Sequence, residues 1–306
     1  MAYLCRLSKT TVVAYIGYFF FRVAVFFLSK LPFAALYVLS DILRVLFYHV
    51  MRYRKKVVLS NLRRCFPEKT EAEIAGIAWK FYRNFCDVLV ENIKIFNLSA
   101  DELGGRCRLL NTDVAENLYQ NGQSIVAVTA HYCNWEWCSV ISNSVKIKII
   151  TIYRPLANAY INQYGLQSRM AYGMVFVPNN QTSSTFEQYK NQPAVYTFLA
   201  DQNPGKMSKA IWTTFFNQPT ACPIGPEKHA ILHNYPVYFL HLQRVKRGYY
   251  TMELIKIADT PATAQPGQIT TAYMHTLENI IRQKPENWLW THRRWKHQQP
   301  PQLPHN

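Results

Sequence analysis

The stretch that decides the fold is Ser124–Glu136, which reads SIVAVTAHYCNWE. Residues 125–130 form a short apolar run rich in strand-forming side chains, which is typical of a fully buried strand in a parallel sheet. His131 follows directly, where such a strand ends, and open α/β sheets bind their ligands at this edge. The pattern therefore predicts a candidate active site at the carboxyl end of this strand.

His131 and Glu136 form a candidate catalytic pair. Because five steps around a regular helix separate two side chains, a contact between them requires His131 to lie in the turn before a helix. A carboxylate that contacts an imidazole holds it in one tautomer. The nucleophile motif G-x-S-x-G is absent, so the pair suits general-base attack by a substrate's own hydroxyl or amine. From the spacing alone, an ordinary structural polar pair is the more common outcome.

Further strand-like runs recur along the chain, and helical patterns fill much of the space between them. The segment 70–96 also reads as a helix, with Thr70 and Glu73 spaced as a capping box. Such alternation predicts an α/β fold with a mixed, largely parallel sheet covered by helices. The strand-like runs are 125–130, 147–153, 174–177, 194–199, 236–242 and 249–257, and the helical patterns are 112–121, 134–142, 158–171, 181–191 and 225–233.

The N-terminal region is strongly apolar. Residues 11–28 are interrupted by Arg22, and the stretch 31–51 contains two charged residues. We interpret residues 1–51 as a membrane anchor made of a helical hairpin, with the first helix spanning or deeply embedded; two core helices of a soluble protein are the alternative. Residues 52–297 are then the catalytic domain, and the proline-containing tail 298–306 is expected to be disordered.

The composition limits the partners. The chain has 306 residues, 49% of them apolar, and a formal net charge of +16. Such a basic balance favours anionic partners, and a cluster at Arg52, Arg54, Lys55 and Lys56 follows the apolar segment, as at a cytoplasmic membrane surface. No zinc-finger spacing or isolated basic arm indicates nucleic-acid binding. Seven scattered cysteines, with no C-x-x-C, indicate neither a disulfide framework nor a metal site.

Several motifs in order resemble the bacterial lipid A biosynthesis acyltransferases, the lauroyl/myristoyl (HtrB-like) branch of the lysophospholipid acyltransferase superfamily. The H-x4-[DE] motif of that family corresponds to His131–Glu136. One departure is Asn217, where the family usually has Gly after the Phe-Phe pair; Asn tolerates a left-handed backbone, so the turn is expected to survive. The other matching stretches are Asn61–Glu68, Tyr153–Pro155, Ala200–Gln202, Phe215–Thr220, Gly225–Pro226 and Trp288–Lys296.

The resemblance implies a glycerolipid acyltransferase-like fold. We expect the reaction to need no cofactor and no metal. It implies transfer of a fatty acyl group from acyl carrier protein, or acyl-CoA, to a hydroxyl of a lipid A precursor at the cytoplasmic face of the bacterial inner membrane. The anionic glycolipid acceptor and the acidic carrier both suit a basic chain. The same chemistry on an aminoacyl lipid, a lysophospholipid or a mannosylated lipid is an alternative, as is a non-enzymatic membrane-surface binding protein.

The candidate site residues follow from strand ends and matching motifs. His131 is expected to act as general base and Glu136 to orient it. Arg154, at the end of another strand, is expected to stabilise an oxyanion or grip a phosphate. Asp201, at the end of the strand 195–200, is expected to pair with Arg154 or Arg169. The candidate catalytic residues are His131, Glu136, Arg154 and Asp201, and the candidate substrate-binding residues are Asn134, Trp135, Arg169, Gln202, Thr220, Arg293 and Arg294.

Overall fold

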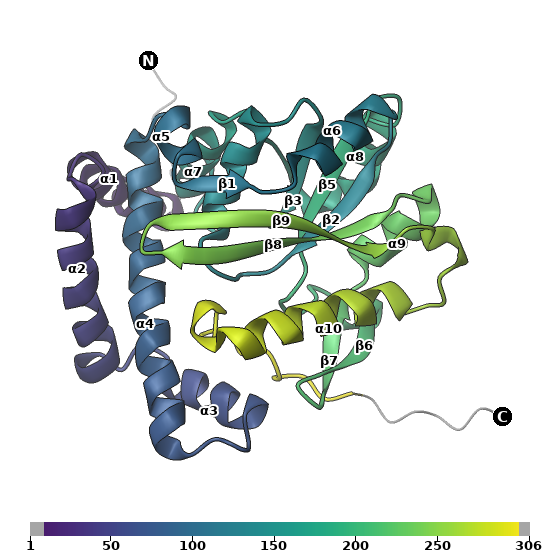
Figure 1. The fold of residues 1–306 in the computed structure, drawn as a ribbon. Helices are drawn as coiled ribbons and strands as arrows, with labels where there is room; N and C mark the ends of the chain where they lie inside the picture. The colour runs from purple at the N-terminus through teal and green to yellow at the C-terminus, as the bar shows by residue number, and fades with distance from the viewer. Residues whose placement is uncertain (1–8, 300–306) are drawn as a thin grey trace.

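A seven-stranded sheet forms the centre of the molecule, in a computed structural model that describes residues 9–299 (Figure 1). The strands are β1 (Cys107–Leu109), β2 (Ile125–Thr129), β3 (Lys148–Tyr153), β4 (Val175–Pro178), β5 (Ala194–Leu199), β8 (Val237–Lys246) and β9 (Tyr249–Ala258), while β6 (Ala210–Phe215) and β7 (Gln218–Pro223) form a separate hairpin.

Helices cover the sheet and extend beyond it. The α-helices are α1 (Lys9–Leu28), α2 (Phe33–Val45), α3 (Lys55–Cys65), α4 (Glu71–Lys94), α5 (Ala100–Gly104), α6 (Thr112–Gln120), α7 (Ala159–Met170), α8 (Thr182–Gln188), α9 (Gly225–His233) and α10 (Gln268–Gln283). A π-helical turn, η1 (Leu46–Val50), continues α2, and 3₁₀ segments occur at η2 (Ile95–Asn97), η3 (Trp135–Asn143), η4 (Asn179–Gln181), η5 (Met207–Lys209), η6 (Pro261–Thr263) and η7 (Pro285–Asn287).

The strand order is β1-β9-β8-β2-β5-β3-β4. The strands β8, β2, β5, β3 and β4 run parallel to one another, and β9 is antiparallel to β8. Every residue of β2 is buried, as its continuous apolar run predicts for a central parallel strand. The predicted α/β fold with a mixed, largely parallel sheet is therefore confirmed.

Most of the local predictions agree with the structure. The helix predicted at 70–96 is α4, and Thr70 and Glu73 form the expected capping box. The helix predicted at 134–142 is η3, whose backbone is 3₁₀ rather than α-helical. Neither the β6–β7 hairpin nor α10 is among the elements that the sequence predicts. At the hairpin turn Asn217 adopts the left-handed backbone expected of it (φ 55°).

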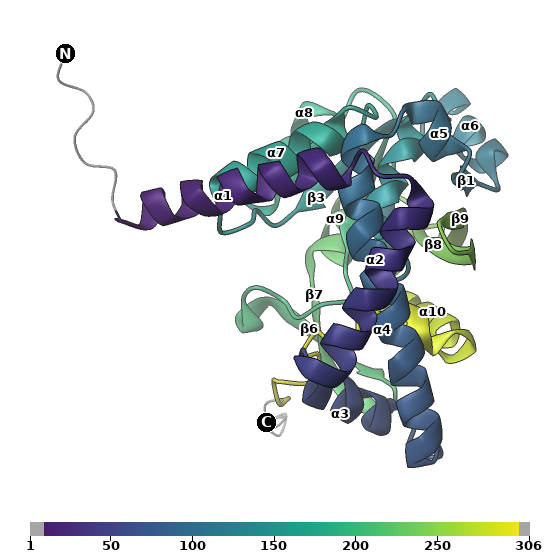
Figure 2. The same ribbon diagram turned by 90° about the vertical axis from the view of Figure 1, so that its left-hand side faces the viewer.

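The two N-terminal helices pack against different parts of the body. Figure 2 shows α1 lying along α7, whereas α2 runs along α4, so the two helices diverge instead of forming the predicted hairpin. Aromatic contacts join Tyr18 of α1 to Tyr160 and Tyr164 of α7. The charge of Arg22, inside the apolar segment, lies over the Tyr164 ring at 5.2 Å. Both helices are thus attached to the α/β body of the protein.

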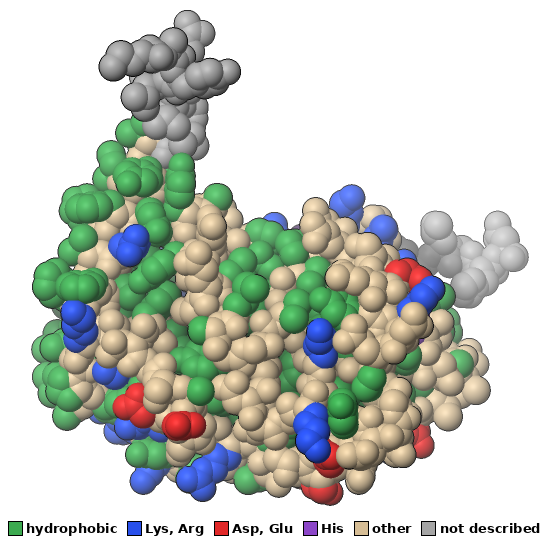
Figure 3. All heavy atoms as spheres, turned by 90° about the horizontal axis from the view of Figure 1, so that it is seen from above, with side chains coloured by type: hydrophobic (Ala, Val, Ile, Leu, Met, Phe, Trp, Pro, Cys, Tyr) green, Lys and Arg blue, Asp and Glu red, His purple; other side chains and the backbone are tan. Residues whose placement is uncertain are grey.

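The outward faces of α1 and α2 expose large apolar side chains. Figure 3 shows these side chains along the side of the molecule that α1 forms. By length and composition, the segment Phe33–Val50 could cross a membrane, while the apolar part of α1 from Val12 to Leu28 is shorter. The remainder of the predicted tail, residues 300–306, lies outside the described residues. The exposed apolar side chains of the two helices are Val12, Val13, Tyr15, Ile16, Phe19, Phe20, Val23, Phe26, Phe27, Val38, Ile42 and Val45.

Candidate active site

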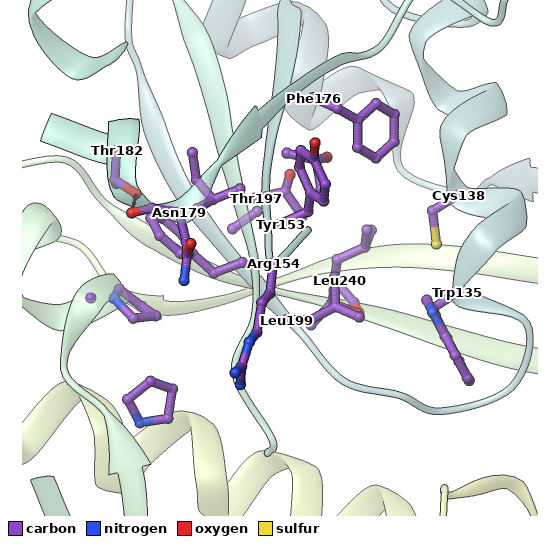
Figure 4. A pocket seen from close by; sticks show the side chains of 18 of the residues that line it. Trp135, Cys138, Tyr153, Arg154, Phe176, Asn179, Thr182, Thr197, Leu199 and Leu240 are labelled. Carbon is purple, nitrogen blue, oxygen red and sulfur yellow. Dashed lines mark hydrogen bonds between the residues drawn. The ribbon is translucent and has the colours of Figure 1, made fainter. Parts of the chain in front are cut away.

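A cavity of about 1040 Å³ opens at the carboxyl ends of β2, β3 and β5. It runs along one face of the sheet beneath η3 and continues around the strand ends toward η4 and the start of α9. Figure 4 shows Trp135 and Cys138 on one side of this cavity, Asn179 and Thr182 on the other, and Arg154 between them. We call the part of the cavity beneath η3 and the part near η4 and α9 its two lobes; between them lies the edge of the sheet where ligands bind in this class of fold.

His131 lies at the cavity and is hydrogen-bonded to Asp201. Nδ1 of His131 lies 2.7 Å from Oδ1 of Asp201, and the backbone N–H of His131 donates to Oδ2 of Asp201 at 3.1 Å. Thr129 of β2 pairs with Leu199 of β5, and His131 and Asp201 each lie two residues further along their strands' chain direction. The strand register therefore produces this contact. The parallel strands β2 and β5 therefore deliver the imidazole and the carboxylate to the same point.

The chemistry of the pair follows from the burial of Asp201. Only 2% of its side chain is exposed. Burial by itself would raise the pKa of Asp201, but the neighbouring His131 and the hydrogen bonds from His131 and Trp288 outweigh burial and lower it. An ionised Asp201 accepts the Nδ1 proton, which leaves the free lone pair of the imidazole on Nε2. Such an arrangement is able to act as a base with its orienting carboxylate.

The C-terminal segment fixes this pair in place. Trp288 donates its indole N–H to Asp201 at 2.9 Å. The carbonyl of His131 accepts from the backbone N–H of Leu289 at 3.1 Å, and Cys133 donates to the carbonyl of Asn287 at 2.9 Å. Trp288 belongs to the matching C-terminal motif, yet no pattern in the sequence indicated that its indole would hold Asp201.

The structure corrects the expected partner of Glu136. Its carboxylate pairs with Arg169 of α7 through two N···O contacts, at 2.5 and 2.9 Å, instead of contacting His131. The ring of Trp135 lies next to His131 instead, with the centroids 4.8 Å apart. The turn at Cys133, which has a left-handed backbone (φ 54°), separates His131 from η3, and this leaves Glu136 beside α7.

The structure also corrects the expected partner of Asp201. Asp201 was expected to pair with Arg154 or Arg169, but its carboxylate oxygens are engaged by His131 and Trp288. Arg154 lines the cavity with an exposed side chain. The candidate arginines therefore stand beside the His–Asp pair and not within it.

The loop that carries His131 is also held from beneath. Asn134 is fully buried and donates to the carboxylate of Glu91 on α4 at 2.8 Å. Glu91 also accepts from Tyr250 of β9 at 2.7 Å and from Tyr37 of α2 at 3.1 Å. Burial raises the pKa of Glu91, opposed by its hydrogen bonds from Tyr250 and Asn134. Asn134 thus positions the loop, and sequence reasoning missed Glu91 because its partners are distant in the chain.

The other candidate residues separate into three groups. Trp135, Arg169 and Gln202 line the cavity. Thr220 and Arg294 are buried: the Thr220 hydroxyl accepts from Trp295, and Arg294 donates to the carbonyl of Ala221. Arg293 lies at a second cleft near the start of α3, described below. The structure therefore gathers only part of the predicted substrate-binding set around His131.

The two lobes differ in their lining. One lobe follows the sheet face from Leu199 down to Val195, about 13 Å for four residues of strand, and its deep end is apolar. The other lobe carries amide, hydroxyl and lysine side chains. The deep apolar end is lined by Leu109, Ala115, Ile141, Val145, Ile147, Ile149 and Leu254, and the polar lobe by Asn179, Asn180, Thr182, Ser183 and Lys228.

Comparison with known proteins identifies relatives of this chain over nearly its whole length. The model of the bacterial lipid A biosynthesis acyltransferase family matches residues 6–297. The lipid A biosynthesis acyltransferase of Haemophilus influenzae is 20% identical over 285 residues, which cover 90% of this chain and 85% of that protein. The lipid A biosynthesis lauroyltransferase of Escherichia coli is 22% identical over 270 residues, which cover 87% of each chain.

Proposed function

Because the chain belongs to the bacterial lipid A biosynthesis acyltransferase family, and is therefore an acyltransferase, we propose that it moves a fatty acyl group from an acyl thioester to a hydroxyl of a lipid A precursor. The observation that supports this most directly is the His131–Asp201 pair, which stands where an apolar lobe and a polar lobe meet. The apolar lobe suits the acyl chain of the thioester, and the polar lobe suits the acceptor. The two reacting groups would then meet beside His131.

In the proposed reaction His131 acts as general base. Its Nε2 takes the proton of the acceptor hydroxyl as that oxygen attacks the thioester carbonyl. The new carbon–oxygen bond forms, and the tetrahedral oxyanion collapses with cleavage of the carbon–sulfur bond. The imidazolium then returns its proton to the departing thiolate. Asp201 holds the tautomer and stabilises the imidazolium, as the carboxylate does in hydrolase triads.

The arginines at the cavity are proposed to meet negative charge. Arg154 is proposed to stabilise the oxyanion or to hold a substrate phosphate, since it lines the cavity at the junction of the two lobes. Glu136 is proposed to act through Arg169, because their two-contact pair fixes the guanidinium beside the cavity. This revises the role of Glu136 from orienting the base to positioning a cation.

The apolar lobe is proposed to hold the acyl chain, with its carbonyl near His131. Its deep end is closed by small and branched side chains, among them Ala115 of α6. Ala115→Leu is expected to fill that end and to shift the preferred donor toward shorter chains. The basic character of the chain, with a net charge of +16, favours an anionic donor, which fits acyl carrier protein and also acyl-CoA.

The exposed apolar faces of α1 and α2 are proposed to rest in the inner membrane, with the catalytic cavity on the cytoplasmic side. Mass spectrometry of membrane lipids from cells with and without this chain tests the proposed reaction. Loss of one acyl group from the lipid A fraction is expected, with restoration by the wild-type chain but not by His131→Ala. If acylation changed only in another lipid class, that lipid would be assigned as the acceptor in place of the lipid A precursor. If acylation changed in no lipid, the proposed function would be contradicted.

A further inference from the structure

A second cleft lies outside the catalytic cavity, where two distant parts of the chain meet. It has a volume of about 500 Å³ and is lined by the loop before α3, the first residues of α3 and the C-terminal segment. We call it the basic cleft. Five of its seven lining residues are cationic, namely Arg52, Arg54, Lys55, Lys56 and Arg293. The other two are Val57 and Leu59.

The positive charge of the basic cleft is not neutralised by the protein. No acidic residue lines it, and none of its five cations forms an ion pair within the described part of the chain. The pKa of Lys55 is lowered by burial and by the charge of Arg52. Like charges held together without counterions repel one another, so an anion bound among them would relieve that repulsion.

The protein holds two of these cations in place. Arg54 donates from Nη1 to the carbonyl of Thr291 at 3.0 Å. The ammonium of Lys55 lies over the ring of Tyr48, 3.5 Å from its centroid. A cleft whose charges are already positioned loses less side-chain entropy when a ligand binds. This distinguishes the basic cleft from a diffuse charged surface.

The surroundings of the basic cleft are apolar. Tyr48 belongs to η1, the end of the apolar segment Phe33–Val50. Val50 and Met51, directly before the cleft residues, are 72% and 58% exposed. Figure 2 shows α3 at the far end of α2 from α1, so the apolar outer face of α2 leads down to the cleft. Cations beside exposed apolar side chains match the boundary between lipid headgroups and acyl chains.

We propose that the basic cleft binds the phosphate group of an anionic membrane lipid. Arginine forks and ammonium groups are the usual partners of phosphate oxygens, and the apolar rim suits the lipid's own chains. The choice of a lipid rests on the proposed action at a membrane, whereas the anion site rests on the cleft alone. An acidic carrier protein would present a broad convex surface, and a cleft bordered by exposed apolar residues favours the smaller lipid headgroup.

The basic cleft is also connected to the catalytic pair. Asn61 of α3 donates to the carbonyls of Trp290 and His292, each at 2.9 Å. The carbonyl of Arg293 accepts from Asn203, which lines the catalytic cavity. The same segment carries Trp288, which holds Asp201. A lipid phosphate bound at Arg293 would therefore fix the segment that fixes the catalytic carboxylate.

The test measures binding without turnover, on the full-length His131→Ala chain in detergent. Three probes are titrated and followed by calorimetry: short-chain phosphatidylglycerol, short-chain phosphatidylcholine and inorganic phosphate. We expect saturable binding of one phosphatidylglycerol, at least tenfold weaker binding of the other two, and competition by phosphate. Combining Lys56→Gln with Arg293→Gln should weaken phosphatidylglycerol binding about 25-fold, since each cation contributes about a factor of 5 toward anionic lipid.

A charge-matched control separates the site from overall charge. Lys146 and Lys190 are exposed and paired with acidic residues elsewhere, and replacing both with Gln removes the same charge. This control is expected to change binding less than twofold. Equal weakening in both variants would overturn the site, because the charge would then act diffusely. Phosphate binding as tight as the lipid would overturn the lipid assignment. Because no step involves acyl transfer, failure of the proposed function would leave these results unchanged.

Discussion

Two acid–base pairs stand at the catalytic cavity, and the fold holds them in different ways. The His131–Asp201 pair lies at the ends of two neighbouring parallel strands, with side chains 18% and 2% exposed. The Glu136–Arg169 pair joins η3 to α7, with side chains 21% and 27% exposed. The first pair depends on the register of the central sheet, and the second on the packing of two surface elements.

From this difference we expect the buried pair to take part in the chemistry and the exposed pair to position a cation. A pair fixed by a sheet register keeps its geometry through the reaction, and a buried carboxylate stabilises an imidazolium more than a solvated one. A pair on surface elements is screened by water and can rearrange. The sequence motif H-x4-E joins one member of each pair, because it records positions along the chain and not the partners that these residues have in space.

The largest effects are expected for the buried pair. His131→Ala should lower acyl transfer by about 10²–10⁴-fold, the usual loss for a general base. Asp201→Asn should cause a similar loss because the amide no longer selects the Nδ1–H tautomer. Steady-state rates of the two single variants and the double variant provide the measurement. The double variant should be little worse than either single one, because the pair acts as a unit.

The control for this prediction is that each variant remains folded and still binds its substrate. Each variant should keep its circular dichroism spectrum and its binding of the acyl donor, so that the loss falls on turnover. If folded Asp201→Asn transferred acyl groups at nearly the wild-type rate, the buried pair would not be the base and its orienter.

A smaller loss is expected at Arg154, which touches neither pair. Arg154→Lys should reduce kcat about 10²–10³-fold at every salt concentration if the guanidinium meets the oxyanion, because Lys lacks the planar fork. Replacing Lys146 with Gln is the matched surface change and should leave kcat unaltered. Kinetics across a salt series separate the two cases. A defect that shrinks as salt rises would place Arg154 among charges that act by long-range attraction.

The exposed pair is expected to matter less than the buried one. Glu136→Gln should reduce kcat/KM roughly tenfold, since Arg169 would lose the carboxylate that positions it; the coupling of such half-exposed pairs is modest. Combining Glu136→Gln with Arg169→Gln should not add a further loss. If Glu136→Gln caused as large a loss of rate as Asp201→Asn, with the same pH dependence, the distinction between the two pairs would be wrong. Glu136 would then act on His131 directly.

The sequence predicts the buried strands of the sheet well and the more exposed β6–β7 hairpin poorly. The buried strands β2, β3 and β5 are continuous apolar runs, and their predicted bounds agree with the structure to within one residue. The β6–β7 hairpin escaped prediction because β6 is half-exposed and β7 contains Pro219 and Pro223, which are typical of loops or edge strands. The helix α10 has apolar residues at helical spacing, so the sequence does carry a helical signal in this region.

The candidate site could be predicted in its members but not in its pairing. His131 and Asp201 were both placed at strand ends, yet nothing local states that β2 and β5 are neighbours in the sheet. The sequence therefore predicts Glu136, the nearest carboxylate along the chain, as the partner of His131. Long-range contacts such as those of Trp288 with Asp201 and of Glu91 with Asn134 span 87 and 43 residues, and they arise only from the assembled fold.

The support beneath the His131 loop is expected to affect stability more than chemistry. Glu91→Ala would leave the side-chain donors of Asn134, Tyr250 and Tyr37 without their acceptor, which should lower the free energy of unfolding by roughly 3 kcal/mol. Glu91→Gln keeps one acceptor oxygen and should lose about 1 kcal/mol. Thermal unfolding in detergent measures both. Unchanged stability in Glu91→Ala would show that the loop is held by its contacts with the C-terminal segment.

The smallest expected effect is a difference in pH dependence between two buried carboxyl groups. The pKa of Asp201 is lowered from 3.8, so its stabilising contribution is present above that pH and is lost as the pH falls through the lower folded value. The pKa of Glu91 is raised from 4.5 by burial, so its contribution is present below that pH and is lost as the pH rises toward the higher folded value. The wild type should therefore lose stability relative to Asp201→Asn below pH 3.8, and relative to Glu91→Gln above pH 4.5. Melting temperatures of the three proteins from pH 3 to pH 8 test both signs. Parallel curves for the wild type and Asp201→Asn would mean that the carboxylate at the catalytic pair is no better stabilised than one in water, and the distinction between the buried and exposed pairs would lose its electrostatic basis.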